Sequence, residues 1–176
     1  QTDETRAHRA ANQAVLLAVA QDHRSFEDAL QRARALGGEP SWIDTCEAAA
    51  AAATRDWARA VAVAQRAWAH TVGHPALADT LANAMSALGE RDAAYTQLLA
   101  AHRACPQSLE LLETTIALGL AGVERLPTAE AQAPGEALLD LAADLDRLAP
   151  CADRDTRRRA AMFRARAALA AGRRDL

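Results

Sequence analysis

The sequence predicts an all-α fold built of antiparallel helix pairs. The chain is rich in alanine, which is the best helix former, and poor in aromatic and β-branched residues. Apolar residues recur three and four positions apart through most long segments, which is the spacing of one buried helix face. Glycine and proline interrupt these segments at short intervals and mark where helices end. We therefore expect about four helix pairs followed by one unpaired C-terminal helix.

The clearest helix pair lies between Pro75 and Pro106. Proline suits the first position of a helix, because its missing N–H has no intrahelical partner there. The first helix is expected to end before Gly89, since a helix C-cap often needs positive φ. The second helix is expected over 92–104. The residues predicted to face inward in this pair are Leu77, Leu81, Ala84, Met85, Leu88, Ala94, Leu98 and Ala101.

This segment resembles a tetratricopeptide repeat (TPR), a helix–turn–helix unit of about 34 residues. The residues that carry the resemblance are Leu81, Ala82, Gly89, Ala94, Leu98, Ala101 and Pro106. The register repeats upstream, because Ala60 precedes Ala94, and Ala67 precedes Ala101, by 34 residues. The resemblance implies a right-handed α-solenoid, a TPR-like superhelix in which the first helices of the pairs line a concave groove.

The pattern predicts one TPR-like array over 1–176. Its repeats are expected at about 2–38, 41–72, 75–106 and 108–150, with a partial repeat over 153–176. The helices are expected over 2–20, 26–36, 41–54, 56–70, 75–88, 92–104, 108–120, 136–149 and 153–171.

Two of these helices carry more detailed predictions. In the first, Val15, Leu16 and Val19 are expected to form the apolar side together with several alanines. The third is expected to begin with Ser41 as its N-cap and Asp44 three residues later, as in a capping box.

The fourth pair departs from the pattern. A loop is expected over 123–135, where Pro127 and Pro134 bound a single possible helical turn. Such an insertion either carries function or is a neutral variation between paired helices. The helix over 153–171 has no following partner, so we expect either a longer parent protein or a second copy that covers it. Self-association through this uncapped C-terminal helix is one expected contact.

The sequence holds no catalytic signature. It has no phosphate-binding loop, nucleophile elbow, zinc-protease motif or dinucleotide fingerprint, so we predict no enzyme activity, cofactor or metal site. Cys46, Cys105 and Cys151 lack metal-ligand or redox spacing. They are either small buried residues or, if the protein is periplasmic, include a Cys105–Cys151 disulfide. His70 and His74 are expected to serve surface or capping roles.

The charge balance favours neither nucleic acid nor membrane. The formal net charge is −3, and no run of 18 apolar residues occurs, so we expect no nucleic-acid partner and no membrane span. All basic residues are arginine, which is typical of a GC-rich bacterial genome. The chain starts with Gln1, as in a trimmed or processed protein, and both bacterial cytoplasm and periplasm stay open.

The TPR resemblance implies a ligand in the concave groove. The outward residues of the first helices there include Trp42, Thr45, Asp79, Asn83 and Ser86. Asn83 falls where peptide-binding members of the family often hold a ligand backbone. Trp42 is either an exposed anchor or a packed filler under the preceding helix.

A basic segment near the C-terminus forms a second candidate surface, with Arg157, Arg158 and Arg164 at its centre. It fits an anionic partner such as a phosphate, a nucleic acid or an acidic helix. It equally fits a solvated face that pairs with nearby carboxylates. The carboxylates expected as partners are Asp140, Asp144, Asp153 and Asp155.

Three functions follow from these features. The first is a non-catalytic scaffold that holds a protein or peptide partner in its concave groove, as part of a larger bacterial protein. The second is a periplasmic TPR module that binds or guides the polymer of an exopolysaccharide secretion system. The third is the accessory repeat domain of a TPR-fused glycosyltransferase or sulfotransferase.

Overall fold

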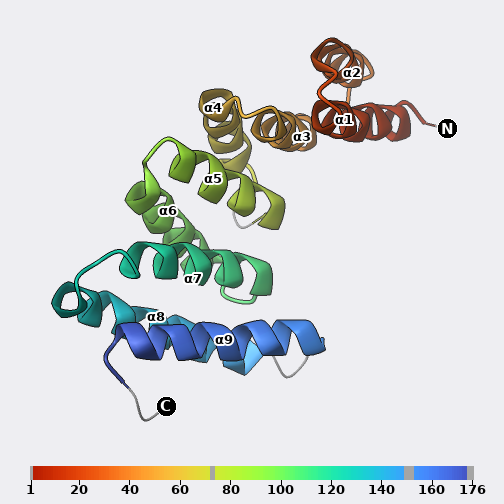
Figure 1. Cartoon of the computed structure of the whole chain (residues 1–176). Coiled ribbons are helices and arrows are strands. Elements are labelled where there is room, and N and C mark those ends of the chain that lie inside the picture. The colour runs from red at the N-terminus through yellow and green to blue at the C-terminus, as the bar shows by residue number, and fades with distance from the viewer. Residues whose placement is uncertain (1, 72–73, 149–152, 174–176) are drawn as a thin grey trace. The chain divides into compact units, whose positions relative to one another are not determined.

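The computed structural model describes residues 2–71, 74–148 and 153–173. These residues form nine α-helices and no strand, which confirms the prediction of an all-α fold (Figure 1). The helices are α1 (Asp3–Val19), α2 (His23–Ala35), α3 (Pro40–Ala53), α4 (Trp57–Trp68), α5 (Pro75–Ala87), α6 (Arg91–Ala104), α7 (Leu109–Val123), α8 (Thr128–Leu148) and α9 (Arg154–Ala170).

The chain divides into two compact units. Unit 1 spans Gln1–Glu90 and holds α1 to α5, and unit 2 spans Arg91–Leu176 and holds α6 to α9. The boundary falls in the turn between α5 and α6, inside the segment that the sequence suggests as one repeat. The prediction of a single array over 1–176 stays a prediction.

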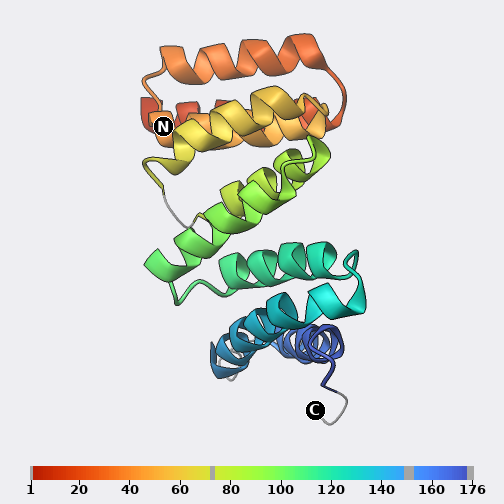
Figure 2. The ribbon, with the colours of Figure 1, turned by 90° about the vertical axis from the view of Figure 1, so that its left-hand side faces the viewer.

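In unit 1, α1 packs against α2 and α3, and α3 and α4 both pack against α5 (Figure 2). The fully buried residues on the packed face of α1 are all alanines, namely Ala7, Ala10, Ala11, Ala14 and Ala18, and Val15 packs partly buried beside them as predicted. The prediction that Leu16 and Val19 lie on this face is wrong, because their side chains are 71% and 66% exposed. Alanine occupies the buried positions because its small side chain lets neighbouring helices approach closely.

The turns of unit 1 repeat with a fixed spacing. Gln21, Arg55 and Gly89 all have positive φ, from 61° to 85°, and the steps from 21 to 55 and from 55 to 89 are 34 residues each. At each turn two backbone N–H groups bond back to the preceding helix, as in a Schellman motif. After the first two turns, Asp22 and Asp56 cap the next helix by accepting a backbone N–H three residues on.

The start of α3 differs from the predicted capping box. The helix begins at Pro40 with Glu39 as its N-cap, and no side chain caps it. The Ser41 hydroxyl donates to the Glu39 carboxylate, and Asp44 accepts hydrogen bonds from Arg66. Proline at the first helical position, with its preset φ, moves the helix start one residue ahead of Ser41.

In unit 2, α7 lies against α6, α8 and α9, and α8 also packs on α9. The loop expected over 123–135 is wrong for most of its length, because α7 extends to Val123 and α8 already starts at Thr128. Pro134 lies inside α8 and removes one backbone hydrogen bond. The helix persists because Ala131, Gly135 and Leu138 on either side of Pro134 are buried in the core.

Gly135 marks the closest approach in unit 2. A Cβ atom at this position would lie 2.6 Å from the backbone nitrogen of Ala171 and 2.7 Å from the carbonyl carbon of Ala170. Only glycine therefore lets α8 meet the end of α9 at this distance. Within the described ranges, no helix is both long and apolar enough to cross a bilayer.

Candidate ligand-binding groove between α6, α7 and α8

Unit 2 contains a groove of about 390 Å³ between α6, α7 and α8. Its lining from α6 is Arg91, Asp92, Tyr95 and Leu99; from α7 it is Leu118, Gly119, Gly122 and Val123; and Leu126, Pro134, Ala137 and Leu138 complete it. Ligand pockets in proteins range from about 300 to 1,000 Å³. The groove thus has room for a small ligand or for one or two side chains of a partner.

Two glycines of α7 shape the groove in opposite ways. A Cβ atom on Gly119 would lie 2.5 Å from Leu138 Cδ2 and 2.8 Å from Tyr95 Cε2, so glycine here lets α6 and α8 close over α7. A Cβ atom on Gly122 would have no atom within 4 Å. Gly122, almost one turn further along α7, therefore leaves the space that the neighbouring side chains do not fill.

One end of the groove is polar. Arg91 and Asp92 lie in the first turn of α6, and Tyr95 follows one turn later on the same helix face. Burial raises the pKa of Tyr95, and the positive charge of Arg103 opposes this only in part. The phenol therefore stays protonated at neutral pH and keeps a hydroxyl donor. The guanidinium Nε of Arg91 has no hydrogen-bond partner among the described residues.

This arrangement suits a ligand with an apolar body and a polar end. Leu99, Leu118, Leu126 and Leu138 present aliphatic surface, while Arg91 and Tyr95 offer hydrogen-bond donors at one side. Sites of this kind bind through apolar contact and orient the ligand with a few polar groups. The groove can hold an apolar side chain while its donors meet backbone carbonyls of the same segment.

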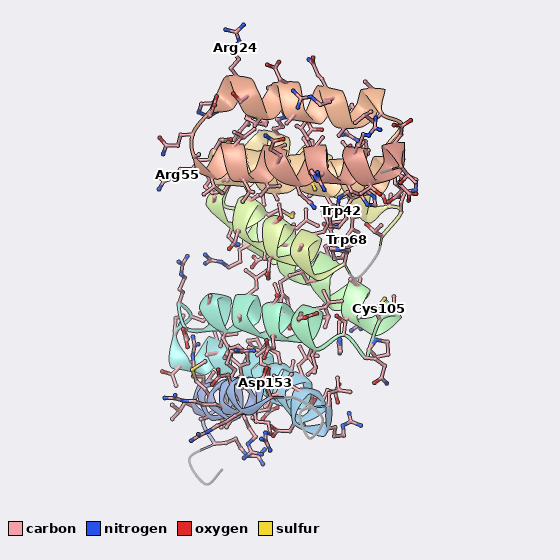
Figure 3. All side chains as sticks on the ribbon, turned by 90° about the vertical axis from the view of Figure 1, so that its right-hand side faces the viewer. Arg24, Trp42, Arg55, Trp68, Cys105 and Asp153 are labelled. Carbon is pink, nitrogen blue, oxygen red and sulfur yellow. The ribbon has the colours of Figure 1, made fainter. Side chains whose placement is uncertain are left out.

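The residues predicted for a concave groove lie in unit 1, where Thr45 is buried and Trp42 is half-buried. Trp42 is half-buried and packs against the core of α1, α2 and α3. Its ring lies 5.8 Å from the His8 ring and 6.4 Å from the His74 ring, and its buried indole N–H finds no acceptor in the described part of the chain. Figure 3 labels Trp42 together with Trp68, which is buried. Thr45 is buried, and its hydroxyl donates to the Ser41 carbonyl at 2.8 Å.

The other predicted groove residues lie together on α5. Asp79 and Asn83 are exposed and one helical turn apart, and Ser86 is half-buried with a hydroxyl that has no hydrogen-bond partner among the described residues. The structure therefore places Asp79 and Asn83 together on the surface of α5, whereas Thr45 is buried on α3. Their binding of a ligand stays a prediction.

The predicted basic surface stays a prediction, and one of its acidic partners differs from those expected. Arg157, Arg158 and Arg164 are all exposed on α9. Arg164 pairs with Asp146 at 2.8 Å rather than with any of the four expected carboxylates. Asp144 pairs with Arg147 on its own helix, and Asp153 caps α9 while its charge also interacts with that of Arg159. Figure 3 shows Asp153 at the start of α9.

Sequence reasoning missed a charged cluster around Glu47 in unit 1. Glu47 is only 6% exposed and accepts hydrogen bonds from Arg34 and from Arg59, whose Nε lies 3.0 Å from its Oε1. Arg59 also pairs with Glu27 and lies 5.6 Å from the centre of the Phe26 ring. The hydrogen bond with Glu27 is the main cause that raises the pKa of Arg59. Glu47 stands alone beside the alanine run 48–53, which is the signal that could have revealed it.

Neither of the two cysteines that the structure describes is exposed. Cys46 is buried, and burial raises the pKa of its thiol to about 11. Cys105 is half-buried, and its predicted pairing with Cys151 involves a position outside the described residues. Among the residues that are described, no three histidine, cysteine, aspartate or glutamate side chains gather as metal ligands.

Comparisons with models of known protein families, with curated proteins and with solved structures find no match. The case for a function therefore depends on the groove, the repeated turns and the charged surfaces of this chain alone. Of these, the groove in unit 2 is the feature whose size and lining fit a ligand.

Proposed function

We propose that this chain is a non-catalytic, TPR-like scaffold that binds a partner protein, and that the groove between α6, α7 and α8 receives an apolar side chain of that partner. The single observation that carries the proposal is the opening at Gly122, where a Cβ atom would meet nothing within 4 Å. A helical scaffold without a binding role would gain by filling this position with alanine, because glycine in a helix costs about 1 kcal/mol.

The TPR-like part of the proposal is supported by the turns of unit 1. Positive φ at Gln21, Arg55 and Gly89 recurs at the 34-residue period of that repeat. Buried residues follow the same period, as Ala33, Ala67 and Ala101 do. We extend this to a right-handed superhelix of antiparallel helix pairs, whose groove-facing residues include Asp79 and Asn83.

The test uses a phage-displayed library of random linear peptides, selected on the whole protein. We expect enriched peptides to share one large apolar residue and to bind with micromolar affinity, as measured by fluorescence anisotropy of labelled synthetic copies. Gly122→Leu should abolish this binding, because the added side chain enters the groove while the helix propensity improves.

The matched control is Ala117→Leu, which adds a similar side chain to an exposed position of the same helix, outside the groove. This variant should bind the peptides as the unchanged protein does. The proposal is wrong if the selection yields no shared apolar residue, or if Gly122→Leu and Ala117→Leu bind the selected peptides equally well.

A further inference from the structure

The outer face of α9 exposes apolar side chains and charge together. We define this face by Arg154, Arg157, Arg158, Ala161, Met162, Ala165 and Leu169, all of which are exposed. Met162 is 46% and Leu169 69% exposed. The opposite face, which includes Phe163 and Ala167, packs on α7 and α8. Exposed apolar residues that gather on one face beside polar residues mark an interaction surface.

The arginines of α9 fall into two groups. Those at its flanks each meet a carboxylate of a neighbouring segment. The pairs are Arg159 with Glu113 at 3.0 Å, Arg164 with Asp146 at 2.8 Å and Arg166 with Glu124 at 2.7 Å. Each of these three arginines, which face the rest of unit 2, therefore forms an ion pair with a carboxylate of that unit.

The second group lies on the outer face. Within the described part of the chain, Arg154, Arg157 and Arg158 form no ion pair. They occupy the first half of the outer face, and Met162 and Leu169 occupy the second half. An element that covers this face must offer apolar residues to one half and negative charge to the other.

We propose that the outer face of α9 binds an acidic amphipathic helix of a partner protein. Ala161, Ala165 and Leu169 are four residues apart, and this ridge fits the groove of a second helix. The small alanines allow close approach, and the three outer arginines supply charge complementarity of the kind that the flanking arginines already find in α7 and α8. α9 has 17 residues, so the contact runs for about 25 Å.

Other occupants fit this face less well. A second copy packed antiparallel about Ala165 would set Arg157 of one chain against Arg173 of the other, which is a like-charge contact. Nucleic acid would leave Met162 and Leu169 exposed, because phosphates contact only the arginines. An anionic membrane surface is favoured by large aromatic residues beside the basic ones, and the outer face has none.

The experiment titrates the full chain into a labelled, synthetic 18-residue helical peptide. The peptide carries leucine and alanine four residues apart on one face and glutamate on both flanks. The control peptide has every glutamate replaced by lysine. We expect the acidic peptide to bind at least about tenfold more tightly, with an affinity that falls as salt is added, because the arginine contacts are exposed.

Two triple variants test whether the arginines on the outer face of α9 make the contact. Changing Arg154, Arg157 and Arg158 to glutamine should weaken acidic-peptide binding about tenfold, since each exposed charge contributes modestly. Changing Arg9, Arg24 and Arg32 to glutamine removes three exposed charges from unit 1 and should change nothing. Equal binding of both peptides, or no effect of the α9 triple change, overturns the proposal. So does tighter binding to vesicles of phosphatidylserine and phosphatidylcholine than to the acidic peptide.

Discussion

The two units differ in how their helices pack together and in how their buried and exposed charges pair. In unit 1, alanine faces and identical turns bring α1 to α5 together, and one buried carboxylate, Glu47, joins α2, α3 and α4 through arginines. In unit 2, glycine makes the closest approach at Gly135, and the ion pairs of α9 are separate and more exposed. The groove lies beside the turn between α7 and α8, in which no residue has positive φ. Unit 1 holds a smaller hollow of about 210 Å³ beside its repeated turn at Arg55 and Asp56, so the larger of these two openings accompanies the irregular turn.

The first prediction tests the charged cluster of unit 1, where we expect the largest effect. Glu47→Ala leaves Arg34 and Arg59 without their shared carboxylate and should destabilise unit 1 by about 2–4 kcal/mol. All three tryptophans lie in unit 1, so urea unfolding followed by tryptophan fluorescence reports on this unit.

The matched change in unit 2 is Glu113→Ala, which removes the partner of Arg159. Its arginine is almost half exposed, so the loss should stay below about 1 kcal/mol. Hydrogen exchange resolved by peptide measures this unit. Equal losses in the two units would remove the distinction between a shared buried carboxylate and separate surface pairs.

The second prediction compares two glycines of unit 2. Gly135→Ala sets a Cβ atom against the backbone of Ala170 and Ala171 and should cost about 2 kcal/mol or more, because backbone cannot easily move aside. Gly122→Ala meets open space and should stabilise α7 by up to about 1 kcal/mol. Opposite signs in hydrogen exchange of α7 and α8 are the expected result, and two changes of the same sign would count against the close packing at Gly135.

The third prediction tests the repeated turns of unit 1. Gly89→Ala should cost about 1 kcal/mol, because alanine resists positive φ and nothing else crowds the site. Arg55→Gly should stabilise unit 1 by about 0.5 kcal/mol, because glycine adopts positive φ without the strain that arginine has there. Thermal unfolding followed by tryptophan fluorescence compares the variants. If Arg55→Gly destabilises unit 1, the two turns are not equivalent.

The fourth and smallest effect concerns pH and unit 2. His102 is buried on α6, and burial lowers its pKa below the ordinary value near 6.5. The unfolded chain therefore binds a proton more readily than the folded one, so unit 2 should lose stability as the pH falls below about 6.5. His102→Gln should flatten this dependence in hydrogen exchange of α6, whereas His70→Gln at an exposed position of unit 1 should leave it in place.

Much of the fold was accessible from the sequence, because local signals set helix ends. Pro75, Gly89 and Pro106 lie where α5 and α6 begin and end, or within two residues of those bounds. The start of α8 was missed because Pro134 reads as a helix break, and only the packing of its neighbours in unit 2 shows that the helix continues. Leu16 was predicted to be buried because leucine is hydrophobic. At the close contacts of α1 with its neighbours, however, only a side chain as small as alanine fits.

The candidate site was less accessible, because it depends on contacts between distant segments. Gly119 and Gly122 lie at the expected end of the helix over 108–120, and two glycines so close together in one helix are the available signal for the groove. Thr45 was placed at the surface by repeat register, but its burial follows from the close approach of α3 to its neighbours. No pattern along the chain specifies that Leu126 and Leu138 line one groove together with residues of α6.

The identical junctions at Gln21–Asp22 and Arg55–Asp56 bear on how such a gene can change. In each junction, a residue with positive φ precedes an aspartate that caps the next helix. Removing codons 22–55 would fuse Gln21 to Asp56 and leave a native-like junction, and duplicating the same stretch would create another. Unit 1 can thus gain or lose a whole 34-residue module in a single recombination event without creating a new kind of junction.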